Sequence, residues 1–183
     1  MDNSSPEELV DYWFSDDVAK HWFNSTKAFD DQLREKYLRV YEQASHGHLD
    51  HWRDTPLGSL ALIILFDQIP LNIFRGQPRS FATEEHARRV ASIAIKHAYD
   101  QQLSDKQKAF MYLPFMHSEN LQDQNLSVEL FEKAGLKENL RFARHHRSII
   151  ERFGRFPHRN AILNRKSTAE EITYLDSPEA FHG

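Results

Sequence analysis

The sequence contains no cysteine, so disulfide bonds, thiolate zinc sites and cysteine nucleophiles are all excluded. With six glycines and seven prolines in 183 residues, and no low-complexity tract, the chain is neither collagen-like nor a flexible linker. Its start is acidic, where a secretory signal would be basic and then apolar. The longest apolar run, 57–66, stops at Asp67, whereas a bilayer span needs about 20 residues. We therefore expect a cytoplasmic protein without a membrane span.

The sequence does contain enough apolar material for one folded domain. Apolar residues make up 40% of the chain, including thirteen phenylalanines, and we expect a single helical domain over residues 1–183. The net charge of −4 is unevenly spread, because residues 1–50 hold eleven acids against five lysines and arginines. Residues 141–166 hold seven arginines and one lysine against Glu151. Either the acidic and basic ends fold against each other, or the basic segment attracts anions.

Helix-start signals and helical periodicity run through the whole chain. Ser5, Pro6 and Glu8 form the pattern of an N-cap, a proline in the first turn and a capping glutamate. The same capping-box spacing recurs at Ser104 with Gln107 and at Ser167 with Glu170. Between these signals the apolar residues repeat every three or four positions, which is the helical period. The expected helices, to within about 2–4 residues at each end, are 6–14, 26–46, 56–69, 84–102, 105–116, 120–133, 136–153 and 168–175.

Short turns join these expected helices, so neighbours should pack as antiparallel hairpins. Helical hairpins build the tetratricopeptide-repeat proteins, but no self-similarity at about 34 residues marks a regular repeat here. We expect an all-α fold of tetratricopeptide-repeat-like hairpins without regular sequence repeats.

Three stretches of the chain resemble a known family. The first is 65–75, which reads Leu-Phe-Asp-Gln-Ile-Pro-Leu-Asn-Ile-Phe-Arg and is followed by Phe81-Ala82. The second is 112–119, Tyr-Leu-Pro-Phe-Met-His-Ser-Glu, with Gln124. The third, 146–160, reads His-Arg-Ser-Ile-Ile-Glu-Arg-Phe-Gly-Arg-Phe-Pro-His-Arg-Asn and is followed by Leu163, Arg165 and Ser167-Thr168. Together with Trp13-Phe14 and Trp22-Phe23, they make nearly the whole chain similar to the bacterial family called domain of unknown function 924.

This resemblance implies an all-helical fold similar to tetratricopeptide-repeat proteins, and it implies no reaction. Three positions depart from the family pattern. Leu71 stands where arginine is frequent, Glu84 where aspartate is frequent and Asn164 where glycine is usual. The first departure would remove one positive charge from the expected site.

The segment 152–160 concentrates cationic side chains where a helix should break. Gly154 can end a helix in the left-handed conformation, and Pro157 makes the residue before it extended. Guanidinium groups hold carboxylate or phosphate through paired donors, so this segment predicts an anion-binding site. The expected ligand-binding residues of this region are Arg152, Arg155, Arg159, Asn160 and Arg165. The alternative is a structural staple, in which the phenylalanines dock in the core and the arginines bond buried acids and helix-end carbonyls.

The candidates for proton transfer are His117, Glu119, His146 and His158. His146 follows Ala143 by three residues and precedes Ile150 by four, which places it on the apolar stripe of its helix. Burial would lower the pKa of this imidazole and keep it neutral, as a general base requires. A histidine on a core face is nevertheless more often a structural group than a reactive one.

Pro114 should kink or end its helix, which would put His117, Glu119 and Gln124 beside the break. There they could face a cavity, or Ser118 could cap the next helix.

Asp67 and Gln68 lie at the end of the most apolar helix. A carboxylate near a helix C-terminus is unfavourable by about 0.3–1 kcal/mol, so Asp67 should have a cationic partner. We expect that partner to be Arg75 or an arginine of the segment 152–160, and we include Asp67, Gln68, Arg75 and Gln124 among the candidate ligand-binding residues.

No metal or cofactor is predicted. The spacing His-Glu-x-x-His or Glu-x-x-His does not occur among the candidates His117, Glu119, His146 and His158, and the nearby arginines would repel a cation. A phosphate-binding glycine loop, a dinucleotide fingerprint and a Gly-x-Ser-x-Gly elbow are also absent from the sequence.

Two functions from different classes remain open. The first is a site for a small anionic or polar ligand, with or without catalysis, and it requires the separated histidines and arginines to converge. The second is a protein-interaction module whose groove takes an acidic peptide or protein. Nucleic-acid binding through residues 141–166 is disfavoured by the net negative charge and the lack of a recognised motif.

Overall fold

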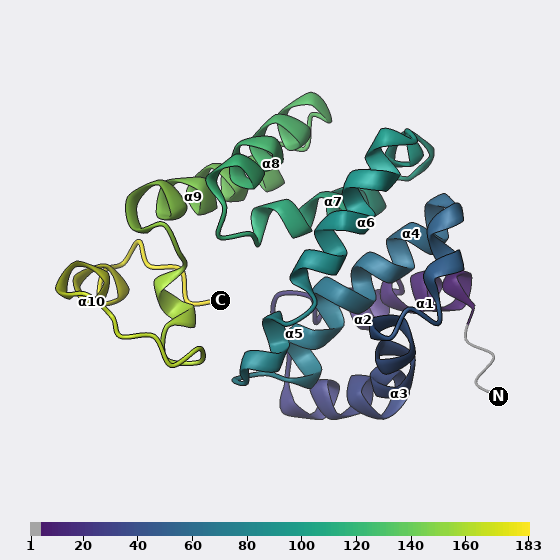
Figure 1. Cartoon of the computed structure of the whole chain (residues 1–183), viewed down its shortest axis with the longest axis horizontal. Coiled ribbons are helices and arrows are strands. Elements are labelled where there is room, and N and C mark those ends of the chain that lie inside the picture. Colours follow the sequence, from purple (N-terminus) through teal and green to yellow (C-terminus); the bar gives the residue numbers. More distant parts are fainter. Residues whose placement is uncertain (1–4) are drawn as a thin grey trace. The chain divides into compact units, whose positions relative to one another are not determined.

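The computed structural model describes residues 5–183, and the expectations for the first four residues lie outside it. Every regular element of residues 5–183 is helical and none is a strand, so the all-α prediction is confirmed (Figure 1). The chain divides into two compact units. The first unit runs to Arg75 and continues as Arg79–Pro114, and the second contains Gly76–Pro78 and Phe115–Gly183. The organisation as one domain and the tetratricopeptide-repeat-like arrangement stay predictions.

The first unit holds the elements from α1 to η4. They are α1 (Pro6–Trp13), α2 (Asp16–Ala19), α3 (Lys27–Ser45), η1 (Asp50–Asp54), α4 (Pro56–Ile63), the π-helical turn η2 (Ile64–Gln68), α5 (Ile69–Ile73), α6 (Glu84–Lys96) and η4 (Tyr99–Gln102). Two elements run across the boundary between the units, η3 (Pro78–Phe81) and α7 (Asp105–Met116). Within the first unit α4 packs against α1 and α6, and α3 packs against α5. The side chains of residues 60–66 are all buried, so α4 and η2 form the centre of this core.

The helical stretch Pro56–Ile73 is long and apolar enough to cross a membrane, but 78% of it is buried inside the structure, as in the core helix of a soluble protein. It extends past the expected end near residue 69 and passes through Pro70. Proline has no N–H to offer the carbonyl of Phe66, and the hydroxyl of Thr83 donates to that carbonyl instead, at 2.7 Å. The helix widens at η2, where the N–H of Ile69 bonds to the carbonyl of Ile64.

The second unit begins with a helical hairpin. α8 (Leu121–Lys133) and α9 (Lys137–Phe153) pack together through a turn in which Gly135 has a φ of +69°. α9 ends at Gly154, whose φ of +68° confirms the left-handed end expected from the sequence. η5 (Pro157–Arg159) and α10 (Ala169–Leu175) follow. A small apolar core joins α9 to α10 and contains Ile149, Ile150, Phe156 and Tyr174.

Two boundaries differ from the expectation. The helix expected over 84–102 is interrupted at Ala98, which has a φ of +56°. The capping box expected at Ser167 and Glu170 lies one residue later, at Thr168 and Glu171. This shift matters because the capping glutamate is then the buried one rather than its exposed neighbour.

Candidate functional site

Glu119 ties the loop before α8 to the segment after α9. Arg165 binds its carboxylate in a paired geometry, with N–O distances of 2.7 and 2.9 Å. The backbone N–H of Phe156 donates to the same carboxylate at 2.7 Å, and its carbonyl accepts from Arg165 at 3.1 Å. Burial by itself would raise the pKa of Glu119, but the hydrogen bonds from Arg165 and Phe156 outweigh it and hold the pKa below its usual value.

Glu171 makes the second ion pair of this unit. Its side chain is only 2% exposed, and it accepts two hydrogen bonds from Arg155, at 2.6 and 2.8 Å. The Thr168 N–H and the Asn160 amide also donate to this carboxylate, at 2.8 and 3.1 Å. The bonds from Arg155 lower the pKa of Glu171 to about 2 against the effect of burial.

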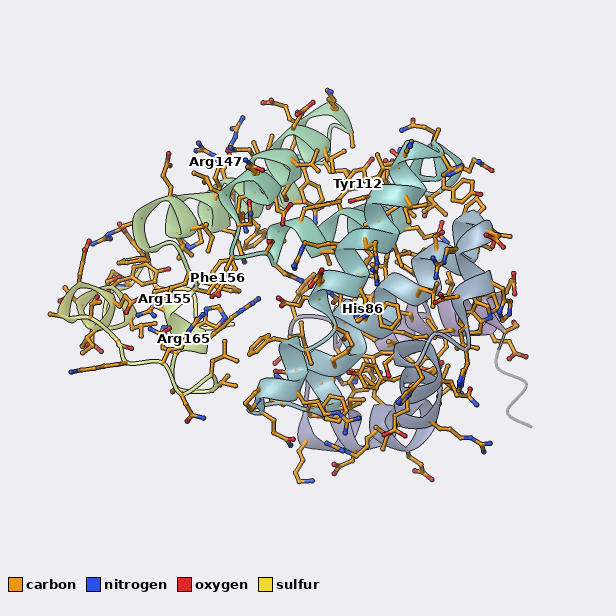
Figure 2. All side chains as sticks on the ribbon, viewed as in Figure 1. His86, Tyr112, Arg147, Arg155, Phe156 and Arg165 are labelled. Carbon is orange, nitrogen blue, oxygen red and sulfur yellow. The ribbon has the colours of Figure 1, made fainter. Side chains whose placement is uncertain are left out.

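Asn160 joins the two ion pairs into one network. Its amide nitrogen donates to Glu171, and its carbonyl oxygen accepts from Arg165 at 3.0 Å. We call the group the carboxylate–guanidinium network, and its members are Glu119, Arg155, Asn160, Arg165 and Glu171. Figure 2 shows Arg155, Phe156 and Arg165 gathered in the same part of the second unit. Arg155 and Arg165 each face an acid of the chain, as the structural-staple interpretation expects.

The charge of the basic segment 141–166 is balanced locally. Six arginines of this segment contact a carboxylate of the second unit. The pairs are Arg141–Glu138, Arg144–Glu132, Arg147–Glu151, Arg152–Glu170, Arg155–Glu171 and Arg165–Glu119. The acids that neutralise these arginines therefore come from within residues 119–171.

His146 is buried on α9, as its place on the apolar stripe predicted, with 4% of its surface exposed. Its Nδ1 lies 2.9 Å from the carbonyl of Phe142. A carbonyl can only accept, so Nδ1 carries the proton and Nε2 carries the lone pair. Burial lowers the pKa of His146 to about 3, and His117, His145 and Arg159 add to this effect. The imidazole is therefore neutral throughout the physiological range.

His158 lies on η5 and is also neutral. Burial, followed by the charge of Arg159 and the neighbouring His146, lowers its pKa to about 3, although Glu119 acts in the opposite direction. Its Nδ1 is buried and has no hydrogen-bond partner within residues 5–183. This nitrogen can donate or accept a hydrogen bond, depending on the tautomer of the ring. Within the described residues it makes none.

The imidazoles of His146 and His158 each lie close to the rings of Phe156 and Phe181. His146 and His158 both lie 5.6 Å from Phe156, measured between ring centroids. Phe181 packs against the same two imidazoles, at 4.4 Å from His146 and 4.9 Å from His158. We call the space bounded by His146, Phe156 and His158 the imidazole slot.

Arg159 supplies a cation beside the slot. The side chain is 6% exposed, and its guanidinium carbon lies 4.8 Å from the centroid of the Phe156 ring. Its Nη2 donates to the carbonyl of His117 at 3.0 Å, which brings the loop before α8 to the same place. Since the charge of Arg159 lowers the pKa of both His146 and His158, it acts on the two imidazoles of the slot.

Gln124 has a mainly structural position. It is fully buried on α8, and its amide nitrogen donates to the carbonyls of Met116 and Ser118, at 2.7 and 2.8 Å. Of the two alternatives for this loop, the cap at Ser118 is wrong, because Asn120 caps α8. Ser118 instead donates to the carboxylate of Asp123 at 2.6 Å. These bonds fix the loop that presents His117 and Glu119.

Four further candidates have contacts within their own units. Arg152 is exposed and pairs with Glu170 at 2.8 Å. Arg75 belongs to the first unit, is exposed and binds Asp30 at 2.7 Å. Asp67 and Gln68 are buried in η2 of the same unit, where the Gln68 amide donates to the Asp67 carboxylate at 2.6 Å. The arginine partner expected for Asp67 stays a prediction.

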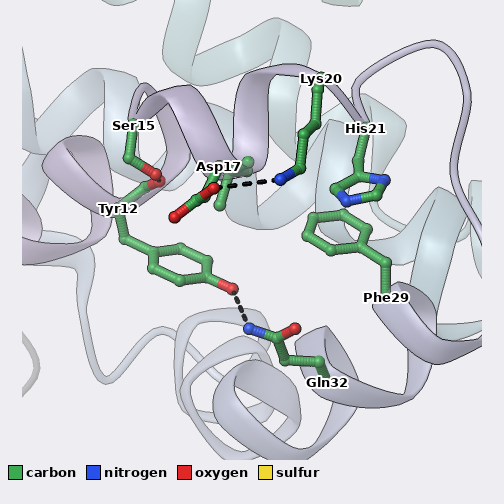
Figure 3. A pocket seen from close by; sticks show the side chains of 8 residues that line it. Tyr12, Ser15, Asp17, Lys20, His21, Phe29 and Gln32 are labelled. Carbon is green, nitrogen blue, oxygen red and sulfur yellow. Dashed lines mark hydrogen bonds and ion pairs between the residues drawn. The ribbon is translucent and has the colours of Figure 1, made fainter.

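The first unit also carries a half-open cavity of about 430 Å³ between α1, α2 and α3 (Figure 3). Its lining residues are Tyr12, Ser15, Asp17, Val18, Lys20, His21, Phe29 and Gln32. None of them was singled out from the sequence as a ligand-binding candidate. Within residues 5–183 no group of three or more histidines and acids is arranged to hold a metal ion.

Sequence reasoning missed two residues of the site. Glu171 had a detectable signal, because it lies three residues after Thr168 at the capping-box spacing. Phe181 had none, since an aromatic residue beyond the last helix indicates nothing about which distant side chains it covers.

Comparison with known proteins relates the sequence to a family and the fold to a solved structure. A family model described as "Bacterial protein of unknown function (DUF924)" matches residues 9–179. The solved structure of a protein of unknown function from Agrobacterium tumefaciens is similar to the chain, with 39% sequence identity and a TM-score of 0.89. That similarity covers 93% of this chain and 96% of the other. No curated protein matches the sequence.

Proposed function

This chain belongs to the bacterial protein family DUF924, and we propose that it binds a small anionic or polar ligand through His146, His158 and Arg159. The family description names no activity. The proposal therefore rests on contacts within the second unit alone. We also propose that the protein acts in the cytoplasm.

One observation carries the proposal, namely that the buried imidazole of His146, the half-buried imidazole of His158 and the buried guanidinium of Arg159 all lie against the ring of Phe156. His146 gives its Nδ1 proton to the Phe142 carbonyl, so its Nε2 is left to accept one hydrogen bond, and the guanidinium favours a negative charge. His158 retains a buried ring nitrogen without a partner in the part of the chain that the structure describes. Such a combination suits a ligand with an acidic group and a hydrogen-bonding edge.

The anion-binding role predicted for the segment 152–160 does not fit Arg155 or the neighbouring Arg165. Arg155 and Arg165 already hold carboxylates in paired geometry. A ligand that used either arginine would have to displace Glu171 or Glu119 and leave that acid with fewer hydrogen bonds. These two ion pairs support the site by fixing the backbone around Phe156 and Asn160.

The perturbed histidines favour binding over general-base catalysis. An efficient general base has a pKa near the working pH, and a group with a pKa of about 3 removes protons poorly at neutral pH. A neutral imidazole of low basicity still serves as a hydrogen-bond acceptor. We therefore propose recognition of a ligand and no reaction at His146.

The alternative, a module that takes an acidic peptide or protein, is favoured by one feature of the second unit. Phe142 on α9 and Leu121 on α8 are both exposed. A Phe142→Asp variant should abolish binding of a peptide partner and leave small-ligand binding unchanged. Nucleic-acid binding is disfavoured further, because phosphates would compete with the carboxylates that contact six arginines of 141–166.

The proposal can be tested by thermal unfolding and calorimetry with inorganic phosphate, succinate and glutamate. Stabilisation of the wild-type protein should be lost in His158→Ala, whose imidazole borders the slot. His48→Ala is the matched control, because His48 is an exposed histidine of the first unit. Equal stabilisation of both variants would refute the assigned site, and the absence of any stabilisation in wild type would refute this class of ligand.

A further inference from the structure

The half-open cavity of the first unit has no part in the proposed function, which uses the second unit. It lies between α1, α2 and α3, and its eight lining residues fall within positions 12–32 of one compact unit (Figure 3). Its volume of about 430 Å³ is within the range of about 300–1,000 Å³ that is usual for small-molecule sites. The cavity is therefore large enough to hold a ligand of its own.

One side of the cavity is apolar. Val18 of α2 and Phe29 of α3 are both buried. The imidazole of His21 stacks on the ring of Phe29, with a centroid distance of 4.4 Å and an angle of 19° between the planes. Figure 3 shows these two rings together at one side of the cavity. A ligand with an apolar face can make dispersion contacts with this side.

Tyr12 and Gln32 offer a donor and an acceptor next to each other. The amide nitrogen of Gln32 donates to the hydroxyl oxygen of Tyr12 at 3.1 Å, so the hydroxyl proton is left to donate. Burial raises the pKa of Tyr12 and outweighs the opposite effect of the Gln32 bond, which keeps that proton in place at neutral pH. Within residues 5–183 the carbonyl oxygen of Gln32 has no hydrogen-bond partner and is left to accept. The pair can therefore bond to a group that accepts and donates at once.

Asp17 and Lys20 form a second pair of donor and acceptor. The ammonium nitrogen lies 3.0 Å from a carboxylate oxygen, and the Asp17 and Lys20 side chains are 95% and 60% exposed. An ion pair as exposed as this one stabilises a fold very little, so each partner is able to bond to a ligand instead. These two residues are the acid and the lysine among the eight that line the cavity, and their charges cancel.

We propose that this cavity binds a neutral polyhydroxylated ligand, namely a carbohydrate. A hydroxyl group both donates and accepts, so one hydroxyl fits Tyr12 with Gln32 and another fits Asp17 with Lys20. The C–H face of a sugar ring suits the apolar side of the cavity. A ligand with a net charge would meet a like charge in either Asp17 or Lys20. The inference is independent of the proposed function, because the two sites lie in different units.

The test compares ligands of one ring size that differ in charge and in hydroxyl groups. The neutral probes are methyl glucoside, methyl galactoside and methyl mannoside, and binding to the full-length protein is followed by NMR titration. The best of these three should bind more tightly than glucuronate or glucosamine, which carry a charge. Cyclohexanol keeps the ring but one hydroxyl, and it should bind about tenfold more weakly. No binding of any of the three methyl glycosides would overturn the inference, as would equal or tighter binding of both charged sugars.

Variants of the lining place the binding in this cavity. Gln32→Ala and Tyr12→Phe should each weaken binding of the best methyl glycoside by about three- to tenfold, since each removes one hydrogen bond. The phenylalanine variant keeps the ring that packs on Tyr37, so the fold is retained. Gln102→Ala is the matched control, because Gln102 is an exposed glutamine of the same unit outside the lining. It should bind like wild type.

Two further variants separate the causes. Asp17→Asn removes the negative charge and should raise the affinity for glucuronate relative to the neutral sugar. His158→Ala should leave glycoside binding unchanged, so a failure of the proposed site in the second unit and a failure of this inference are read separately. Equal glycoside affinities of wild type, Gln32→Ala and Tyr12→Phe would refute the cavity as the binding site.

Discussion

Lowering the pH from 7.5 to 5 should destabilise this protein through His146 and His158. Both imidazoles have a folded-state pKa of about 3, against an ordinary value of 6.5. As the pH falls below 6.5 the unfolded chain binds a proton at each site, and the folded chain does not bind it until about pH 3. The stability contributed by keeping the two rings neutral is thus complete above pH 6.5 and declines steadily below it.

The magnitude follows from the size of the shift. One pKa unit corresponds to about 1.4 kcal/mol, so each site should cost about 2 kcal/mol of unfolding free energy at pH 5. The loss for both sites, about 4 kcal/mol, is a large part of the 5–15 kcal/mol that stabilises an ordinary domain. Glu119 and Glu171 do not contribute much in this range. Their lowered pKa values give stability that is lost only below the ordinary carboxyl pKa of 4.5.

The assay is urea unfolding at pH 7.5, 6 and 5, with wild type and His146→Asn. Asparagine places an N–H near the position of the imidazole Nδ1, so the bond to the Phe142 carbonyl is retained without a group that titrates. This variant should lose about 2 kcal/mol less than wild type between pH 7.5 and 5. His48→Asn, on an exposed histidine of the first unit, should follow wild type. Identical pH dependence of wild type and His146→Asn would show that the buried imidazole is not kept neutral by the fold.

Two further predictions concern stability at neutral pH. Glu119→Gln weakens the partly buried pair with Arg165 and should lower the unfolding free energy by about 2 kcal/mol, whereas Glu138→Gln in an exposed pair should cost less than about 1 kcal/mol. Similar losses from both variants in urea unfolding would contradict a special role for Glu119. Thr83→Val removes the donor to the Phe66 carbonyl and should cost about 1–3 kcal/mol, while Thr83→Ser should retain most of the stability. Should serine prove as harmful as valine, the hydroxyl is not what stabilises the helix there.

The sequence by itself determined most helix ranges, the helix end at Gly154 and the burial of His146. Caps and apolar periodicity act within about four residues, which is why most helix ranges and the break at Gly154 could be predicted. The same periodicity placed His146 in the core. The side on which a residue of a helix lies follows from its spacing relative to apolar neighbours, so no tertiary information was required.

Only the tertiary structure decided which residues far apart in the sequence contact one another. Arg165 binds Glu119, 46 positions away, and no local pattern distinguishes that acid from others in the chain. The helix that continues through Pro70 depends on a hydroxyl donated by Thr83. Phe181 covers the imidazoles only because α10 returns the chain to α9. Each of these contacts joins segments whose meeting depends on the packing of whole helices, and the energy of any one contact is too small to specify that packing from the sequence.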